Sequence, residues 1–285
     1  MNLNNFAVQI PTNQQKITII PIEVHYSNRK LSNGFCMRTW RSILKRLEDD
    51  KFCYAIFPGD IRDTDRPSSR ERKEYAYHEH ERKPALTEED ENDQLILNAT
   101  IIKDLKPVTH KILGMLDGDH FKRYADGSTS TQYICQKLGI PQAYLGERLG
   151  WVSMTFNRLG GVCSLSILVR HGVGGTGRIG SDINRLIAQN EQFEADLFIG
   201  GHTHKKWFYS MPTFYAGKYE IKQKTTGYAR AGSLLRNTVK GQTLYNELSE
   251  CSPLLIGYPE IYIYLKRSRC LTNGQMVITG MQGLN

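Results

Sequence analysis

The sequence lacks any run of apolar residues long enough to cross a membrane. A membrane helix needs about 20 consecutive, mostly apolar residues, and no stretch of the 285 residues approaches that length. The first five residues, Met1 to Asn5, have neither the basic start nor the apolar run of a secretory signal. We therefore expect no membrane partner and a cytoplasmic protein.

Paired cysteines and internal repeats are also missing. The six cysteines are scattered without a Cys-x-x-Cys pair, a pattern that favours buried reduced thiols over a disulfide framework or a zinc knuckle. No repeat or low-complexity linker interrupts the chain, whose length allows one large domain or two small ones.

What the chain does have is an ordinary globular composition with an excess of positive charge. Hydrophobic residues make up 40% and charged residues 23%, as in soluble domains generally. The formal net charge of +8 favours polyanionic partners. Nucleic acid is the commonest such partner, but charge alone raises that expectation only modestly.

Hydrophobic periodicity predicts alternating strands and helices, with strands dominating later in the chain. The dense charge of residues 66–93 is typical of a solvated helix or mobile loop. This order of elements favours an α/β layered domain built as a sandwich. We expect strands at 16–22, 52–57, 111–116, 151–156, 162–169 and 195–199, helices at 37–47, 95–105, 131–138 and 182–190, and strand-like segments at 207–209, 261–265 and 276–278.

Acidic residues and histidines follow five of the predicted strands. Each cluster alone is weak, since an Asp after Gly is usually a turn former and a lone His is usually structural. Together they place several histidines and acidic groups at strand ends, where layered α/β proteins carry their active-site loops. The clusters are Glu23-Val24-His25, Gly59-Asp60-Ile61-Arg62-Asp63, Gly118-Asp119-His120, His171-Gly172 and Gly201-His202-Thr203-His204.

Carboxylate and imidazole together are typical ligands of Mn, Zn, Fe or Ni ions. A carboxylate between two cations about 3.5–4 Å apart can bridge them, and such a pair can clamp both the attacking and the leaving oxygen of a phosphoester.

The ordered clusters resemble the motifs of the calcineurin-like metallophosphoesterases, which read DxH, GDxxD, GNH, a lone His before small residues, and GHxH. The match spans residues 23 to 204, and GDxxD and GHxH fit completely. Weaker similarity at 132–146 and 253–257 resembles phosphoesterases encoded by bacteriophages and prophages, which would place the protein in a host cytoplasm.

This resemblance implies a four-layer α/β/β/α sandwich. It would be a single domain over residues 1–285, with a charged helical insert at about 66–93 and a β-rich C-terminal part at about 205–285.

The resemblance also implies a role for each motif residue. Two divalent ions, Mn first, would be held by two ligand groups that share Asp60. The first group is Glu23, His25, Asp60 and His204, and the second is Asp60, Asp119, His171 and His202. Asp63 would orient a metal ligand, His120 would be the general acid, and Arg123 could hold a phosphate oxygen or be a simple surface charge.

Two positions depart from the family pattern. Glu23 stands where the family has Asp, and Asp119 stands where it has Asn. Three anionic ligands instead of two would leave a pair of divalent ions with a residual charge of +1 instead of +2. We expect weaker attraction for a substrate phosphate and stronger retention of the metals.

These observations predict a metal-dependent phosphoesterase, with a phosphodiester in nucleic acid as the first expected substrate. The basic charge and the many Lys and Arg residues after Asp63 favour that substrate. Two alternatives stay open. One is a phosphomonoesterase acting on a phosphoprotein or a small molecule, and the other is a non-catalytic scaffold with a degraded site.

Overall fold

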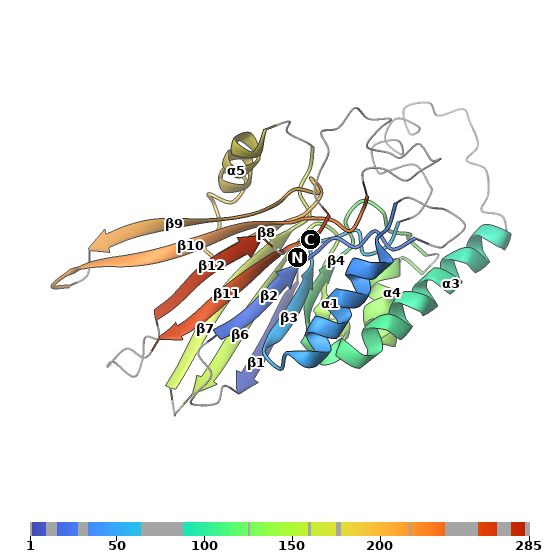
Figure 1. The fold of residues 1–285 in the computed structure, drawn as a ribbon, viewed down its shortest axis with the longest axis horizontal. Helices are drawn as coiled ribbons and strands as arrows, with labels where there is room; N and C mark the ends of the chain where they lie inside the picture. Colours follow the sequence, from blue (N-terminus) through green and yellow to red (C-terminus); the bar gives the residue numbers. More distant parts are fainter. Residues whose placement is uncertain are drawn as a thin grey trace.

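The described part of the chain folds into a mixed α/β structure with two six-stranded sheets (Figure 1). The expected α/β class is therefore confirmed. This computed structural model describes residues 2–9, 16–27, 34–63, 88–124, 126–158, 161–174, 178–216, 218–236, 256–266 and 275–282. Most neighbouring strands in the central part of each sheet run parallel.

The first sheet has the strand order β1-β6-β7-β8-β10-β9. The β1/β6, β7/β8 and β8/β10 pairs are parallel, whereas β6/β7 and β10/β9 are antiparallel hairpins. The strands are β1 (Leu3–Gln9), β6 (Leu149–Arg158), β7 (Gly161–Arg170), β8 (Leu197–Gly200), β9 (Lys206–Ala216) and β10 (Ile221–Ala231).

The second sheet has the order β12-β11-β2-β3-β4-β5. Its β2, β3, β4 and β5 are parallel, and nearly every residue of β2, β3 and β4 is buried. Parallel strands covered on both faces have such continuous apolar runs. The strands are β2 (Lys16–Pro21), β3 (Cys53–Phe57), β4 (Ile112–Leu116), β5 (Tyr144–Gly146), β11 (Pro259–Lys266) and β12 (Gln275–Gln282).

One apolar cluster joins the two sheets. Ile19 and Ile56 of the second sheet share it with Met154, Ile167 and other buried residues of the first. Every second residue of these strands points into this cluster, since side chains alternate between the faces of a sheet.

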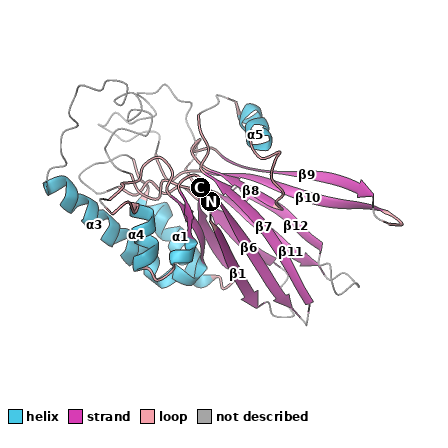
Figure 2. Ribbon diagram, turned by 180° about the vertical axis from the view of Figure 1, so that it is seen from behind, coloured by secondary structure: helices cyan, strands magenta, loops and turns pink. Residues whose placement is uncertain are grey.

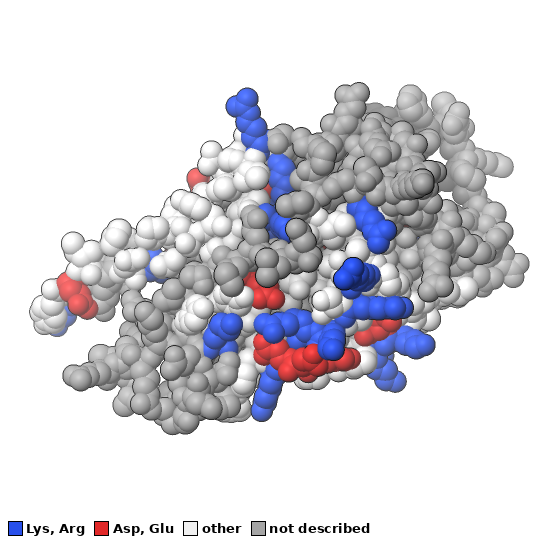
Figure 3. Space-filling view, in the orientation of Figure 1, with Lys and Arg blue, Asp and Glu red and all other residues white. Residues whose placement is uncertain are grey.

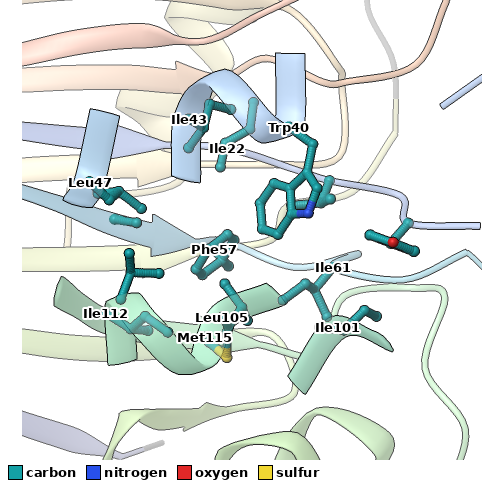
Figure 4. Packing of buried hydrophobic residues seen from close by; sticks show 14 of the residues in the cluster. Ile22, Trp40, Ile43, Leu47, Phe57, Ile61, Ile101, Leu105, Ile112 and Met115 are labelled. Carbon is teal, nitrogen blue, oxygen red and sulfur yellow. The ribbon is translucent and has the colours of Figure 1, made fainter. Parts of the chain in front are cut away.

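Three helices, α1 (Met37–Asp49), α3 (Glu88–Leu105) and α4 (Ser130–Lys137), lie together on one side of the molecule (Figure 2). On α1 the residues Trp40, Ile43 and Leu47 recur at helical spacing and are buried. They pack with Phe57 and Met115 in a second apolar cluster (Figure 4). Burial of each such side chain stabilises the fold by about 1.5–3 kcal/mol.

The helix α5 (Ile179–Ala188) packs against the first sheet. Its residue Leu186 is buried with Leu168, Phe198 and Trp207 in a third apolar cluster. The hairpin β9–β10 extends away from the rest of the molecule (Figure 1).

Most predicted elements are present, but three strands were not anticipated. Residues 37–47, 95–105, 131–138 and 182–190 fall largely within α1, α3, α4 and α5. The strands β1, β5 and β10 were missed. Of the charged segment at 66–93, residues 66–87 lie outside the described part of the chain, and residues 88–93 belong to α3.

The described cysteines form no disulfide. Cys36, Cys53 and Cys135 are buried and Cys163 is half-buried, and these four described cysteines are free thiols. No helix in the described ranges combines the length and apolar character that a membrane crossing requires.

Candidate metal centre

The five predicted clusters converge because each follows the carboxyl end of a parallel strand. Glu23 and His25 follow β2, Asp60 follows β3, and Asp119 follows β4 in the second sheet. His171 follows β7, and the segment 201–204 follows β8 in the first sheet. Neighbouring parallel strands end at one edge of a sheet, so residues distant in sequence meet there.

Asp60 lies at the middle of this arrangement. Its Oδ2 atom is 3.3 Å from Nε2 of His171 and 3.9 Å from Nε2 of His25. Its Oδ1 atom accepts hydrogen bonds from the backbone N–H groups of Asp119 (2.6 Å) and His120 (2.9 Å). One carboxylate oxygen is thus anchored to the segment after β4, and the other faces the histidines.

The ligand atoms form overlapping groups, each within a span of 4.8 Å. One group is Glu23, His25 and His204, and a second is Asp119, His171 and His202. Asp60 belongs to two further groups, one with Glu23 and His171 and one with His25 and His120. The structure therefore brings together all seven residues expected to be metal ligands.

His171 is fully buried and touches three carboxylates. Its Nδ1 is 3.2 Å from Glu23 Oε1, and its Nε2 is 3.2 Å from Asp119 Oδ2 and 3.3 Å from Asp60 Oδ2. Burial lowers the pKa of His171, but the charges of Asp60, Asp119 and Glu23 outweigh burial and raise this pKa well above its usual value. The centre is strongly negative and favours cations.

His25 and His204 belong to the ligand group that contains Glu23. Their rings are 4.6 Å apart in an edge-on arrangement. Burial, together with His25, lowers the pKa of His204 to about 3, and burial lowers the pKa of His25 as well. Both rings are therefore neutral near pH 7, the form in which imidazole binds metals.

His120 and Asp63 form a pair beside the ligand groups. Nδ1 of His120 is 2.9 Å from Oδ1 of Asp63. Burial lowers the pKa of His120, but the charge of Asp60 and the hydrogen bond and charge of Asp63 outweigh burial and raise it to about 9. The imidazole of His120 is therefore in its doubly protonated, positively charged form near neutral pH.

Backbone conformation at the centre is unusual. His25, Asp60, His202 and His204 have φ angles of 51°, 49°, 72° and 55°, and they are the four non-glycine residues of the described chain with positive φ. Left-handed backbone is costly for such residues and concentrates at functional sites. All four are residues that the family resemblance implies as metal ligands.

Gly118 is required by close packing at the same place. Its φ is 80°, and a Cβ atom there would collide with the carboxylate and the backbone nitrogen of Asp60. Only glycine lets the segment after β4 come near enough to donate its N–H groups to Asp60.

A buried ion pair behind the β8 segment was not anticipated. Arg230 of β10 donates from Nη1 to the carbonyl of Gly201 (2.7 Å) and from Nη2 to Oδ1 of Asp182 on α5 (3.1 Å). Asp182 Oδ2 also accepts a hydrogen bond from Trp207 Nε1 (2.8 Å). This pair holds the segment that carries His202 and His204, and no local pattern in the sequence pointed to it.

The arginine that was expected at the centre, Arg123, and an unexpected one, Arg148, have different partners. Arg123 pairs with Glu147 and donates to the carbonyl of Gly127 (3.0 Å) on the surface. Arg148, which the motifs did not single out, pairs directly with Asp119. A role for Arg123 in holding phosphate stays a prediction.

These residues fit a pair of divalent cations. The donor set is the carboxylates and imidazoles that such ions prefer. Oε2 of Glu23 is fully buried and has no hydrogen-bond partner among the described residues. An orphaned buried carboxylate oxygen is costly unless a cation or donor satisfies it.

Comparison with known proteins adds little to this geometry. No family model and no curated protein matches the chain. One solved structure similar to it is a conserved uncharacterized protein from Streptococcus pneumoniae, described as a predicted phosphoesterase. The likeness covers 94% of this chain and 99% of that chain, at 12% identity and a TM-score of 0.33. A likeness this distant carries no weight for fold or function.

Proposed function

We propose that this protein is a dinuclear metal-dependent phosphoesterase. The observation that carries the proposal is the pair of ligand groups, Glu23/His25/His204 and Asp119/His171/His202, with Oδ2 of Asp60 near a histidine of each, 3.9 Å from His25 and 3.3 Å from His171. Such an arrangement matches what two-metal hydrolysis of a phosphoester requires. The ions would be divalent, with Mn as the first choice and Zn, Fe or Ni as alternatives.

The proposal includes the four-layer α/β/β/α sandwich that the family resemblance implies. It is supported by the positions of the three apolar clusters. One joins the two sheets, one lies with α1, α3 and α4, and one lies with α5. The whole chain would then form one domain, with the centre at the edge where β2, β3, β4, β7 and β8 end.

The protein's own residues supply positioning and a proton. When bound, the ions supply a water acidic enough to act as nucleophile near neutral pH and positive charge to stabilise the transition state. Asp63 holds Nδ1 of His120, which leaves Nε2 to give its proton to the departing oxygen of the substrate. The raised pKa of His120, about 9, keeps that proton available at neutral pH.

The proposed substrate is a phosphodiester in nucleic acid. The net charge of +8 favours a polyanion, and Lys and Arg side chains gather around the middle of the face seen in Figure 3, beside a group of acidic side chains. Binding to such a substrate would weaken steeply as salt increases, because counterions are released from the phosphates.

Metal content and model substrates test the proposal directly. We expect about two Mn ions per chain after loading and Mn-dependent hydrolysis of a bis-aryl phosphate faster than that of the mono-aryl phosphate. The Asp60→Asn variant, which loses the shared carboxylate, is expected to lose both the bound Mn and the Mn-dependent hydrolysis. Faster mono-aryl hydrolysis would favour the phosphomonoesterase, and a protein without bound metal would indicate the scaffold.

A second screen addresses the substrate class. Purified, Mn-loaded protein would be incubated with single-stranded DNA, duplex DNA, RNA, cyclic nucleotides and phosphopeptides. We expect cleavage of a nucleic acid that falls as potassium chloride increases. Turnover of phosphopeptides alone would contradict the nucleic-acid proposal while leaving the metal centre intact.

A further inference from the structure

Arg148 occupies the turn by which the chain passes from the second sheet to the first. It lies between β5 and β6, which belong to different sheets. Backbone hydrogen bonds fix this turn on both sides of the centre. The carbonyl of Glu147 accepts from the N–H of Gly118 (3.1 Å), and the carbonyl of Arg148 accepts from the N–H of His171 (2.9 Å).

The guanidinium of Arg148 reaches the centre through Asp119. Its Nη2 donates to Oδ1 of Asp119, and its Nη1 lies 3.4 Å from the carbonyl of Gly172. The other oxygen of Asp119, Oδ2, faces His202 Nδ1 at 2.8 Å and His171 Nε2 at 3.2 Å. The two oxygens of one carboxylate are therefore divided between the arginine and the ligand histidines.

We propose that Arg148 is a positioning residue that offsets the charge of Asp119 and so sets the net charge that a substrate phosphate meets. This inference rests on the proposed dinuclear centre. Two divalent ions and three carboxylates leave a charge of +1, and the permanently charged guanidinium of Arg148 restores +2. The charge of +1 expected from the sequence included only the metal ions and their ligands. The structure places the positive charge of Arg148 beside one of those ligands, Asp119.

Inorganic phosphate and Mn are the probes that test the inference. Calorimetry would measure Mn binding to metal-free protein and then phosphate binding to Mn-loaded protein. Since charges a few ångströms apart interact strongly near a protein surface, we expect Arg148→Gln to weaken phosphate binding about tenfold or more. Arg148→Lys, which keeps the charge, is expected to recover part of the loss.

The double variant separates charge from direct contact. Asp119→Asn alone is expected to bind phosphate more tightly than the parent, because it removes a negative charge. Asp119→Asn combined with Arg148→Gln has the parent's charge and is expected to bind phosphate within about threefold of the parent. A double variant as weak as Arg148→Gln would overturn the inference, since Arg148 would then act by touching phosphate.

Arg46→Gln is the matched control. Arg46 also pairs with carboxylates, and its side chain has the same 38% exposure as that of Arg148. It lies near the start of β3, at the end of the sheet opposite Asp60, and is expected to leave phosphate affinity unchanged. Equal phosphate affinity of parent and Arg148→Gln, with both binding Mn, would overturn the inference alone. A parent that binds no Mn would overturn the proposed function and this inference with it.

Discussion

Single residues with left-handed backbone make up much of the candidate centre. His25, Asp60, His202 and His204 all hold positive φ angles, which cost about 1–2 kcal/mol each for residues with a Cβ atom. The surrounding hydrogen bonds, such as the N–H of His25 to the carbonyl of Asp60 (2.8 Å), hold them in place. Substitution of a glycine that packs against one of these residues, such as Gly118 against Asp60, is therefore expected to disturb the centre.

Substitution of Gly118 tests whether its close approach to Asp60 is needed for metal binding. Gly118→Ala places a Cβ against Asp60, whereas Gly139→Ala has nearly the same φ (75° against 80°) and no atom within 4 Å of the new Cβ. Both variants are expected to lose about 1–2 kcal/mol through backbone strain, but only Gly118→Ala should lose Mn binding. Calorimetric Mn titration of the two variants checks this. Similar Mn affinities would show that the close approach to Asp60 is dispensable.

His120 is predicted to act on the leaving group. Replacing it by Asn is expected to lower kcat about 10²–10⁴-fold for a phosphodiester with an alkyl leaving group. The loss should be much smaller for a para-nitrophenyl leaving group, which departs without a proton. Steady-state kinetics with the two substrates measure the difference. If kcat falls equally for the two substrates and the Mn content is reduced, His120 is instead a metal ligand, as its position near His25 and Asp60 allows.

At the scale of elements, α5 and β10 support the β8 segment through one buried ion pair. Asp182 and Arg230 are 0% and 1% exposed. Asp182→Asn leaves the buried guanidinium without a counter-charge and is expected to cost about 3–5 kcal/mol in the free energy of unfolding. Asp50→Asn, which affects the half-exposed pair with Arg46, should cost at most about 1 kcal/mol. Urea unfolding of the parent and the two variants measures these losses in the free energy of unfolding.

A functional readout accompanies the stability measurement. Because Arg230 holds the carbonyl of Gly201, Asp182→Asn is also expected to weaken Mn binding under conditions where the variant is fully folded. An unchanged Mn affinity would make this pair purely structural.

Elements differed in how far local sequence could predict them. The helix α1 and the strands β2, β3 and β4 have continuous or periodic apolar residues, and they were predicted within a few residues. The strand β10 mixes Lys, Gln, Thr and Arg with few apolar residues, and it forms because it pairs with β8 and β9. Pairing across the chain leaves no signal within the strand itself.

For the whole molecule, metal binding should be coupled to stability. Glu23, Asp60 and Asp119 are buried together, so ions that satisfy them stabilise the folded state. Mn at a concentration 100 times its dissociation constant is expected to add about 2.7 kcal/mol to the free energy of unfolding, and EDTA should remove that gain. Urea titrations with and without Mn measure it, and Asp60→Asn should show no such dependence. A parent equally stable in EDTA and in Mn would contradict a high-affinity centre.

The sequence by itself determined which residues are suited to bind cations and that they follow apolar strands. Both properties are local, because side-chain chemistry belongs to single residues and strands of this kind are recognised from neighbouring apolar residues. The resemblance of the ordered motifs to those of the calcineurin-like metallophosphoesterases implied a shared carboxylate at Asp60 and a proton donor at His120, and both roles stay predictions.

Only the tertiary structure decided the partners of the charged groups. Arg123 and Arg148 look alike in sequence, yet one pairs with Glu147 on the surface and the other with Asp119 at the centre. The pair of Asp182 and Arg230 joins a helix to a strand 48 residues later. Electrostatic energy depends on distance in space, and that distance exists only after both sheets have assembled.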